Sequence, residues 1–178
     1  MTKRSKIREG LHQLSKAEQA QTDALLLQVG KIVVTQSNIE NTLALIVFLL
    51  CRSMRFVKAM DYFYSVYGFE KRLELTDFLM QKDGPQELLD DWAIIVESLS
   101  KHRVTRNLVA HQGISYSINE DRTLQGLLSP PWMRRNKSKG RELTVADLRR
   151  SADDFERIHG LVADFARELS KVPPPYLS

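Results

Sequence analysis

Apolar residues recur at three- and four-residue intervals along most of the chain, which is the spacing that places them on one face of an α-helix. The longest such pattern, over residues 18–52, includes Leu25, Ile32, Ile39 and Leu43. Glycine and proline then divide the remaining helical pattern into separate segments. The predicted helices cover residues 18–52, 56–67, 69–82 and 86–112, followed by a final helix from Thr144.

The pattern changes between the fourth and the final predicted helix. Ile114, Tyr116 and Ile118 alternate with polar residues, which indicates a short strand, and residues 123–128 are expected to return as a second strand. Thr144 begins the final helix with Asp147 at the capping-box position. We therefore predict an all-α fold, a four- to five-helix up-and-down bundle, with a small strand and loop insertion. The predicted parts are a basic N-terminal extension (1–17), a helical domain (18–172, with the insertion at 113–143) and a proline-rich tail (173–178).

Length and composition favour one ordinary globular domain. The chain has 178 residues, of which 43% are apolar, and one cysteine, Cys51, so neither an internal disulfide nor a cysteine-rich zinc site is expected. The longest unbroken apolar run is the nine residues 43–51, whereas a membrane span needs about 20. The basic N-terminal residues are followed by polar ones rather than by the apolar stretch of a signal peptide. We expect a cytoplasmic protein with no membrane partner.

Positive charge is concentrated in two short segments. Residues 1–16 carry a net charge of +4, and residues 134–141 carry five cations and no anion, so the rest of the chain is acidic at −5. Such segments attract phosphate backbones, although charge runs are also common on solvated surfaces. The second segment is the candidate RNA-binding loop, with Arg134, Arg135, Lys137, Lys139 and Arg141.

Several common kinds of catalytic and cofactor site have no motif in this sequence. There is no glycine-rich phosphate loop, no His-Glu-x-x-His pair and no Gly-x-Ser-x-Gly elbow. The four histidines have no ligand-like spacing to one another. We therefore expect no metal and no cofactor.

One stretch near the end of the fourth predicted helix combines residues that suit phosphate chemistry. Arg106, Asn107 and His111 fall within six positions, and Asn107 and His111 share a helix face. Arginine offers a fixed fork of donors for phosphate, and histidine exchanges a proton near neutral pH. Together they suffice for cleavage of RNA by the neighbouring 2′-hydroxyl, with histidine as the general base and arginine stabilising charge on the phosphate. The structural alternative is a pair of helix-end residues that interact with the last carbonyls.

The string Arg106-Asn107-Leu108-Val109-Ala110-His111 resembles the signature of the HEPN (higher eukaryotes and prokaryotes nucleotide-binding) domain family, an arginine, a polar residue and then a histidine late in a bundle helix. The resemblance extends over roughly residues 20–170 through the order of elements. It implies a helical bundle, usually a homodimer paired through the motif helices, which is often a metal-independent endoribonuclease of toxin–antitoxin or phage-defence systems. RNA would be the substrate, and an antitoxin or regulatory protein a further partner.

Three other polar residues are candidate supporting groups. A glutamate in the first long helix is common in the family, and Glu40 matches it. Because Glu40 lies within or beside the apolar stripe, we predict that it is buried near the fourth helix and pairs with Arg103 or Arg106. His102 lies four residues before Arg106 and is either a surface residue or a supporting one.

The sequence therefore leads to two function classes. The first is an RNA-binding hydrolase, an endoribonuclease that uses Arg106, Asn107 and His111. The second is a non-catalytic dimeric module of HEPN type that binds nucleic acid, nucleotide or a partner protein. Only the first class requires Arg106 and His111 to act together on one phosphate.

Overall fold

A computed structural model describes residues 15–51, 54–118, 124–129 and 142–173. Over these residues the chain is mostly helical, with five α-helices and a three-stranded antiparallel sheet that lies in the sequence between the fourth and the fifth of them. The elements are α2 (Lys16–Leu50), α3 (Phe56–Ser65), α4 (Phe69–Asp83), the 3₁₀ turn η1 (Gln86–Leu88), α5 (Leu89–His111), β1 (Gly113–Ile118), β2 (Leu124–Ser129), β3 (Leu143–Thr144) and α6 (Val145–Lys171). Each predicted helix and both predicted strands are present, although residues 86–88 form a 3₁₀ turn and the fourth predicted helix begins at Leu89; β3 was not predicted.

Local capping explains where two of the long helices begin. The backbone N–H of Ser15 donates to the Glu18 carboxylate over 2.7 Å, and the N–H of Glu18 donates back to the Ser15 hydroxyl over 3.2 Å. The same reciprocal arrangement joins Thr144 and Asp147 at the start of α6. Each capping box satisfies backbone donors that the first turn leaves without partners. The Thr144–Asp147 box confirms the sequence prediction.

The end of α3 differs from the predicted one. The sequence placed the stop at Gly68, but α3 ends at Ser65 because Val66 is already extended, with φ −77° and ψ 123°. Gly68 instead precedes α4, with φ 85°, a backbone conformation that residues with a side chain rarely adopt. The glycine therefore shapes the connection into α4 rather than ending α3.

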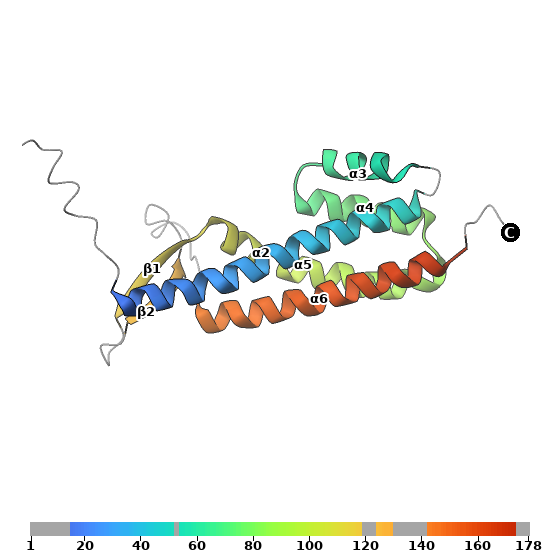
Figure 1. The fold of residues 1–178 in the computed structure, drawn as a ribbon. Coiled ribbons are helices and arrows are strands. Elements are labelled where there is room, and N and C mark those ends of the chain that lie inside the picture. The colour runs from blue at the N-terminus through green and yellow to red at the C-terminus, as the bar shows by residue number, and fades with distance from the viewer. Residues whose placement is uncertain (1–14, 52–53, 119–123, 130–141, 174–178) are drawn as a thin grey trace, which may run out of the picture. The chain divides into compact units, whose positions relative to one another are not determined.

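The chain divides into two compact units, and α2, α5 and α6 contribute residues to both. Unit 1 comprises residues 1–29 and 108–149 and contains the sheet. Its strand order is β1-β2-β3, with Gly113 opposite Ser129 and Leu128 opposite Leu143. Figure 1 shows β1 and β2 beside the first turns of α2. The apolar core of unit 1 consists of Leu25, Val109, Leu127, Leu128, Leu143 and Leu148.

One close approach joins the sheet to α2 within unit 1. A Cβ added to Gly126 would lie 3.0 Å from Leu25 Cδ1 and 3.2 Å from Gln21 Cβ. Tyr116 of β1 also reaches α2, where its hydroxyl bonds to that of Thr22. Because the Thr22 hydroxyl donates to the Glu18 carbonyl, Tyr116 is the donor in this pair. A residue without a side chain at position 126 lets β2 lie against the helix.

Unit 2 comprises residues 30–107 and 150–178 and holds the larger core. Trp92 of α5 is fully buried, packs against the Phe165 ring of α6 at 5.3 Å, and donates its indole N–H to Asp77 of α4 over 2.9 Å. Helices α3 and α4 contact each other, as Figure 1 shows. The largest buried side chains of this unit are Ile32, Ile39, Leu43, Ile46, Phe63, Met80, Trp92, Phe155, Ile158 and Leu169.

Helix α2 is long and apolar enough to cross a membrane, judged by length and composition alone. Core helices of soluble proteins pass the same test, and 44% of its most apolar window is buried in the structure. The absence of a membrane partner and the cytoplasmic location remain predictions.

Candidate functional site

Arg106 rests on an aromatic ring. In unit 2 its guanidinium carbon lies 5.9 Å from the centroid of the Phe69 ring, within the range of a cation–π contact. Phe69 is the first residue of α4 and only 6% exposed, so the ring is a fixed support. One guanidinium nitrogen donates to the side-chain oxygen of Asn107 over 3.1 Å. The Arg106 and Asn107 side chains predicted to act together are therefore in contact.

Among the residues that the structure describes, no carboxylate pairs with Arg106. Arg103, one helical turn earlier on α5, pairs with Glu70 at the surface. Arg72 pairs with Glu40. Arg106 has no such partner among the described residues, so its positive charge is available to an incoming phosphate.

The predicted partner of Glu40 was wrong. Glu40 pairs with Arg72 of α4, not with Arg103 or Arg106 of α5, and it also accepts a hydrogen bond from Gln36 over 3.3 Å. The sequence prediction failed because it considered only the arginines next to the motif. Of the predicted burial near the fourth predicted helix, only limited exposure is confirmed: the Glu40 side chain is 15% exposed, and its partner comes from the third predicted helix.

Arg72 is the centre of a polar cluster that sequence reasoning missed. Besides Glu40, it donates from Nε to the Val66 carbonyl over 3.0 Å and lies over the Tyr64 ring at 4.9 Å and the Phe63 ring at 5.7 Å. These contacts connect α2 and α4 to the end of α3. The sequence signal was a cation three residues after Phe69 and directly before Leu73, between two apolar positions of α4.

Tyr64 belongs to the same cluster. Its hydroxyl donates to the Asn41 side-chain oxygen over 2.5 Å. Partial burial raises the pKa of Tyr64 above its ordinary value of 10.0, the nearby Glu40 charge raises it further, and Arg72 opposes both effects. Tyr64 is therefore a neutral hydrogen-bond donor at physiological pH.

His102 has partners on two sides. Its Nδ1 lies 2.8 Å from the Ser98 carbonyl oxygen, and its Nε2 lies 3.5 Å from the Asp154 carboxylate. The ring also meets Phe155 edge-on at 5.8 Å. These contacts direct the imidazole toward α6, whereas Arg106 of the same helix contacts α4. The structure thus gives His102 a packing role, and no contact with Arg106 is seen.

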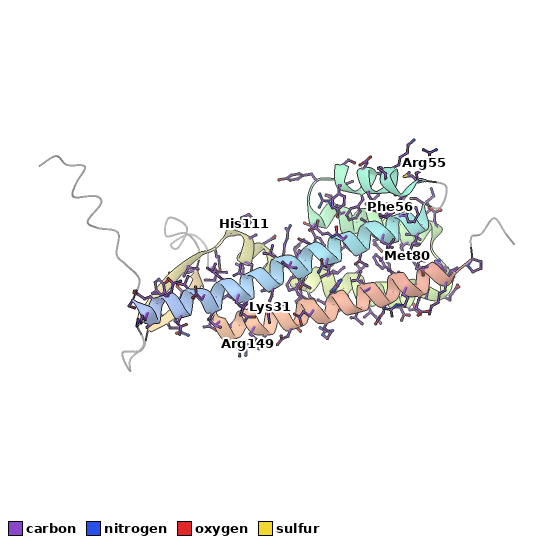
Figure 2. All side chains as sticks on the ribbon, viewed as in Figure 1. Lys31, Arg55, Phe56, Met80, His111 and Arg149 are labelled. Carbon is purple, nitrogen blue, oxygen red and sulfur yellow. The ribbon has the colours of Figure 1, made fainter. Side chains whose placement is uncertain are left out.

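His111 belongs to unit 1 and is described there by itself. It is the last residue of α5 and is exposed, two positions before β1 begins at Gly113 (Figure 2). The backbone N–H of Gln112 donates to the Leu108 carbonyl over 3.0 Å, which completes the final turn. The imidazole is thus accessible to solvent, as a general base for a large substrate must be.

The candidate RNA-binding loop lies outside the described residues, so the prediction for Arg134, Arg135, Lys137, Lys139 and Arg141 stays a prediction. Within the described ranges, no group of three or more histidine, cysteine, aspartate or glutamate side chains is placed to hold a metal ion.

A pocket of about 290 Å³ lies between α5 and α6 in unit 2, and no motif residue lines it. It is lined by Leu88, Asp91, Ile94, Ile95, Leu161, Asp164, Phe165 and Glu168.

Comparison with known proteins gives no relative. No family model, no curated protein and no solved structure matches the chain.

Proposed function

We propose that this protein is an endoribonuclease of HEPN type that cleaves RNA without a metal ion, in a toxin–antitoxin or phage-defence system. The observation that carries the proposal is the state of Arg106, a cation supported on the buried Phe69 ring and not paired with a carboxylate in the described part of the chain. Arg72 and Arg103, by contrast, each pair with a carboxylate.

The proposed reaction uses only protein side chains. His111 takes the proton of a ribose 2′-hydroxyl, the 2′-oxygen forms a bond to the adjacent phosphorus, and the bond from phosphorus to the 5′-oxygen breaks. A proton donor then protonates the leaving 5′-oxygen. The products are a 2′,3′-cyclic phosphate and a 5′-hydroxyl end, and no oxidant, metal or cofactor is needed.

Arg106 stabilises the charge that develops on the phosphate. Its planar fork of donors matches two phosphate oxygens, which a lysine ammonium does not reproduce. The contact with Asn107 occupies one nitrogen and orients the plane of the guanidinium. Asn107 therefore acts in this proposal as a positioning residue.

The proposal also includes the finer architecture and the assembly. We infer an up-and-down bundle of HEPN type that pairs as a homodimer through its motif helices. Such pairing would let His111 of the partner subunit supply the proton for the leaving oxygen, since each chain brings one motif histidine. An antitoxin or other regulatory protein would hold the activity in check.

The test is cleavage of total RNA in the presence of EDTA by the wild-type protein and two variants. His111→Ala should reduce the rate by about 10²–10⁴-fold, because a general base is lost. Arg106→Lys should also lose activity, whereas Arg167→Lys, an exposed α6 residue paired with Asp164, should not. Wild-type products should carry 2′,3′-cyclic phosphate ends. Full activity in both motif variants, or activity that EDTA removes, would contradict the proposal.

A further inference from the structure

Tyr67 is the most exposed large apolar side chain of the described residues, with 95% of its surface accessible. It lies in the short connection between α3, which ends at Ser65, and α4, which begins at Phe69. Gly68, with φ 85°, separates the exposed Tyr67 from the buried Phe69. A tyrosine ring this exposed has both faces available for stacking on a flat ligand.

Tyr67 is also close in the chain to the proposed phosphate-binding arginine. Arg106 lies over the Phe69 ring, and Tyr67 precedes Phe69 by two residues, which limits the separation of their Cα atoms to about 7 Å. The backbone of Tyr67 and the guanidinium of Arg106 are thus both close to Phe69, the first residue of α4.

Three further exposed residues, two cations and a second aromatic ring, lie at the start of α3 or on it. Arg55, Lys58 and Tyr62 are exposed and follow one another at three- and four-residue spacing. Figure 2 shows Arg55 where α3 begins. No carboxylate within the described ranges forms an ion pair with Arg55 or Lys58, although α3 also carries Asp61. The cations lie at the start of α3 and the aromatic rings at or just after its end, and surfaces that bind single-stranded nucleic acid combine these two kinds of side chain.

We propose that these four residues, Arg55, Lys58, Tyr62 and Tyr67, here called the Tyr67 surface, bind single-stranded RNA. Tyr67 stacks on an unpaired base next to the phosphate that Arg106 meets, and the α3 cations follow the backbone. The inference rests on the proposed ribonuclease function and adds to it the substrate class. Double-stranded RNA is excluded as a ligand of Tyr67 because its bases are already stacked on one another and paired.

The experiment measures binding of a fluorescent single-stranded RNA oligonucleotide, with His111→Ala protein so that no cleavage occurs. Adding Tyr67→Ala should weaken binding by about 5- to 150-fold, the range for loss of one stacked base, while Tyr67→Phe should bind as the parent does. Phe78→Ala is the matched control, because Phe78 is also an exposed aromatic residue, at 61%. A duplex of the same sequence should show no dependence on position 67.

The outcomes separate this surface from the proposed function. If wild-type protein cleaves RNA but Tyr67→Ala binds the oligonucleotide as the parent does, RNA binding by the Tyr67 surface is rejected and the proposed ribonuclease function is kept. If binding depends on Tyr67 but no cleavage is seen, the surface stands without the enzyme. Absence of RNA binding by the parent overturns the surface, as does a Tyr67→Ala variant that changes only self-association, which would assign Tyr67 to a protein interface.

Discussion

The carboxylate of Glu40 on α2 is held by the guanidinium of Arg72 on α4, and both side chains are mostly withdrawn from water. The exposed fractions are 15% for Glu40 and 19% for Arg72. Stacking of Arg72 on Tyr64 and Phe63 fixes the guanidinium in place. The pair therefore ties α2, α3 and α4 together within unit 2.

Removal of Arg72 should destabilise the fold strongly. Arg72→Ala leaves Glu40 as a largely buried charge without its partner, and we expect a loss of about 2–4 kcal/mol in the free energy of unfolding. Adding Glu40→Gln should recover part of that loss, because the uncompensated charge disappears. Urea denaturation followed by circular dichroism measures both effects.

Lys71 and Glu74 provide the matched control for this ion pair. They also form an ion pair on α4, but their side chains are 66% and 56% exposed. Lys71→Ala should cost much less than Arg72→Ala, since exposed ion pairs are screened by water. Equal losses for Arg72→Ala and Lys71→Ala would show that burial of the Glu40 pair has no energetic consequence.

A side chain at position 126 should push β2 away from α2. Gly126→Ala places a methyl group 3.0 Å from Leu25 Cδ1, and Leu25 is fully buried and has little room to move. We expect a loss of about 1–3 kcal/mol in the free energy of unfolding. Gly160→Ala is the comparison, because nothing lies within 4 Å of its added Cβ and it is inside α6, where it should stabilise by about 0.5–1 kcal/mol. A neutral or stabilising Gly126→Ala would mean that β2 adjusts freely.

The basic segment 134–141 is predicted to contact RNA. Each phosphate contact on a single strand contributes about 0.7 to the slope of log affinity against log salt, so replacing all five cations with glutamine should lower the slope by up to about 3.5. Lys171→Gln, an exposed lysine paired with Glu168 on α6, should leave it unchanged. If the slope of log affinity against log salt is the same before and after all five cations are replaced, the segment is solvated surface that does not contact RNA.

The working unit is predicted to be a homodimer with a shared cleft. Light scattering at micromolar concentration should give twice the chain mass of 20.5 kDa. When wild-type and His111→Ala chains are co-expressed, activity should fall with the square of the wild-type fraction, because a mixed dimer lacks one of the two histidines. A linear fall, or a stable active monomer, argues for a site within one chain.

Periodicity identified every long helix, because each is amphipathic or bordered by Gly, Pro or a polar cap. It did not identify which apolar positions are covered. Val33 is four residues after Val29, and Val104 is four residues before Leu108, which is the spacing of one helix face, yet the side chains of Val33 and Val104 are 50% and 62% exposed. A stripe of several residues is wider than the contact that a neighbouring helix makes, so its edge positions depend on which helices meet and where.

What the sequence by itself determined is local: the helices and strands, the capping box at Thr144, and the presence of Arg106, Asn107 and His111 at the end of one helix. These follow from side-chain spacing and backbone hydrogen bonding within a few residues. Which cations are neutralised was decided only by tertiary structure. Glu40 and Arg72 are 32 positions apart, and Arg103 and Glu70 are 33 apart. No local rule selects one arginine over another at that separation, because the choice depends on which helix faces meet in the packed core.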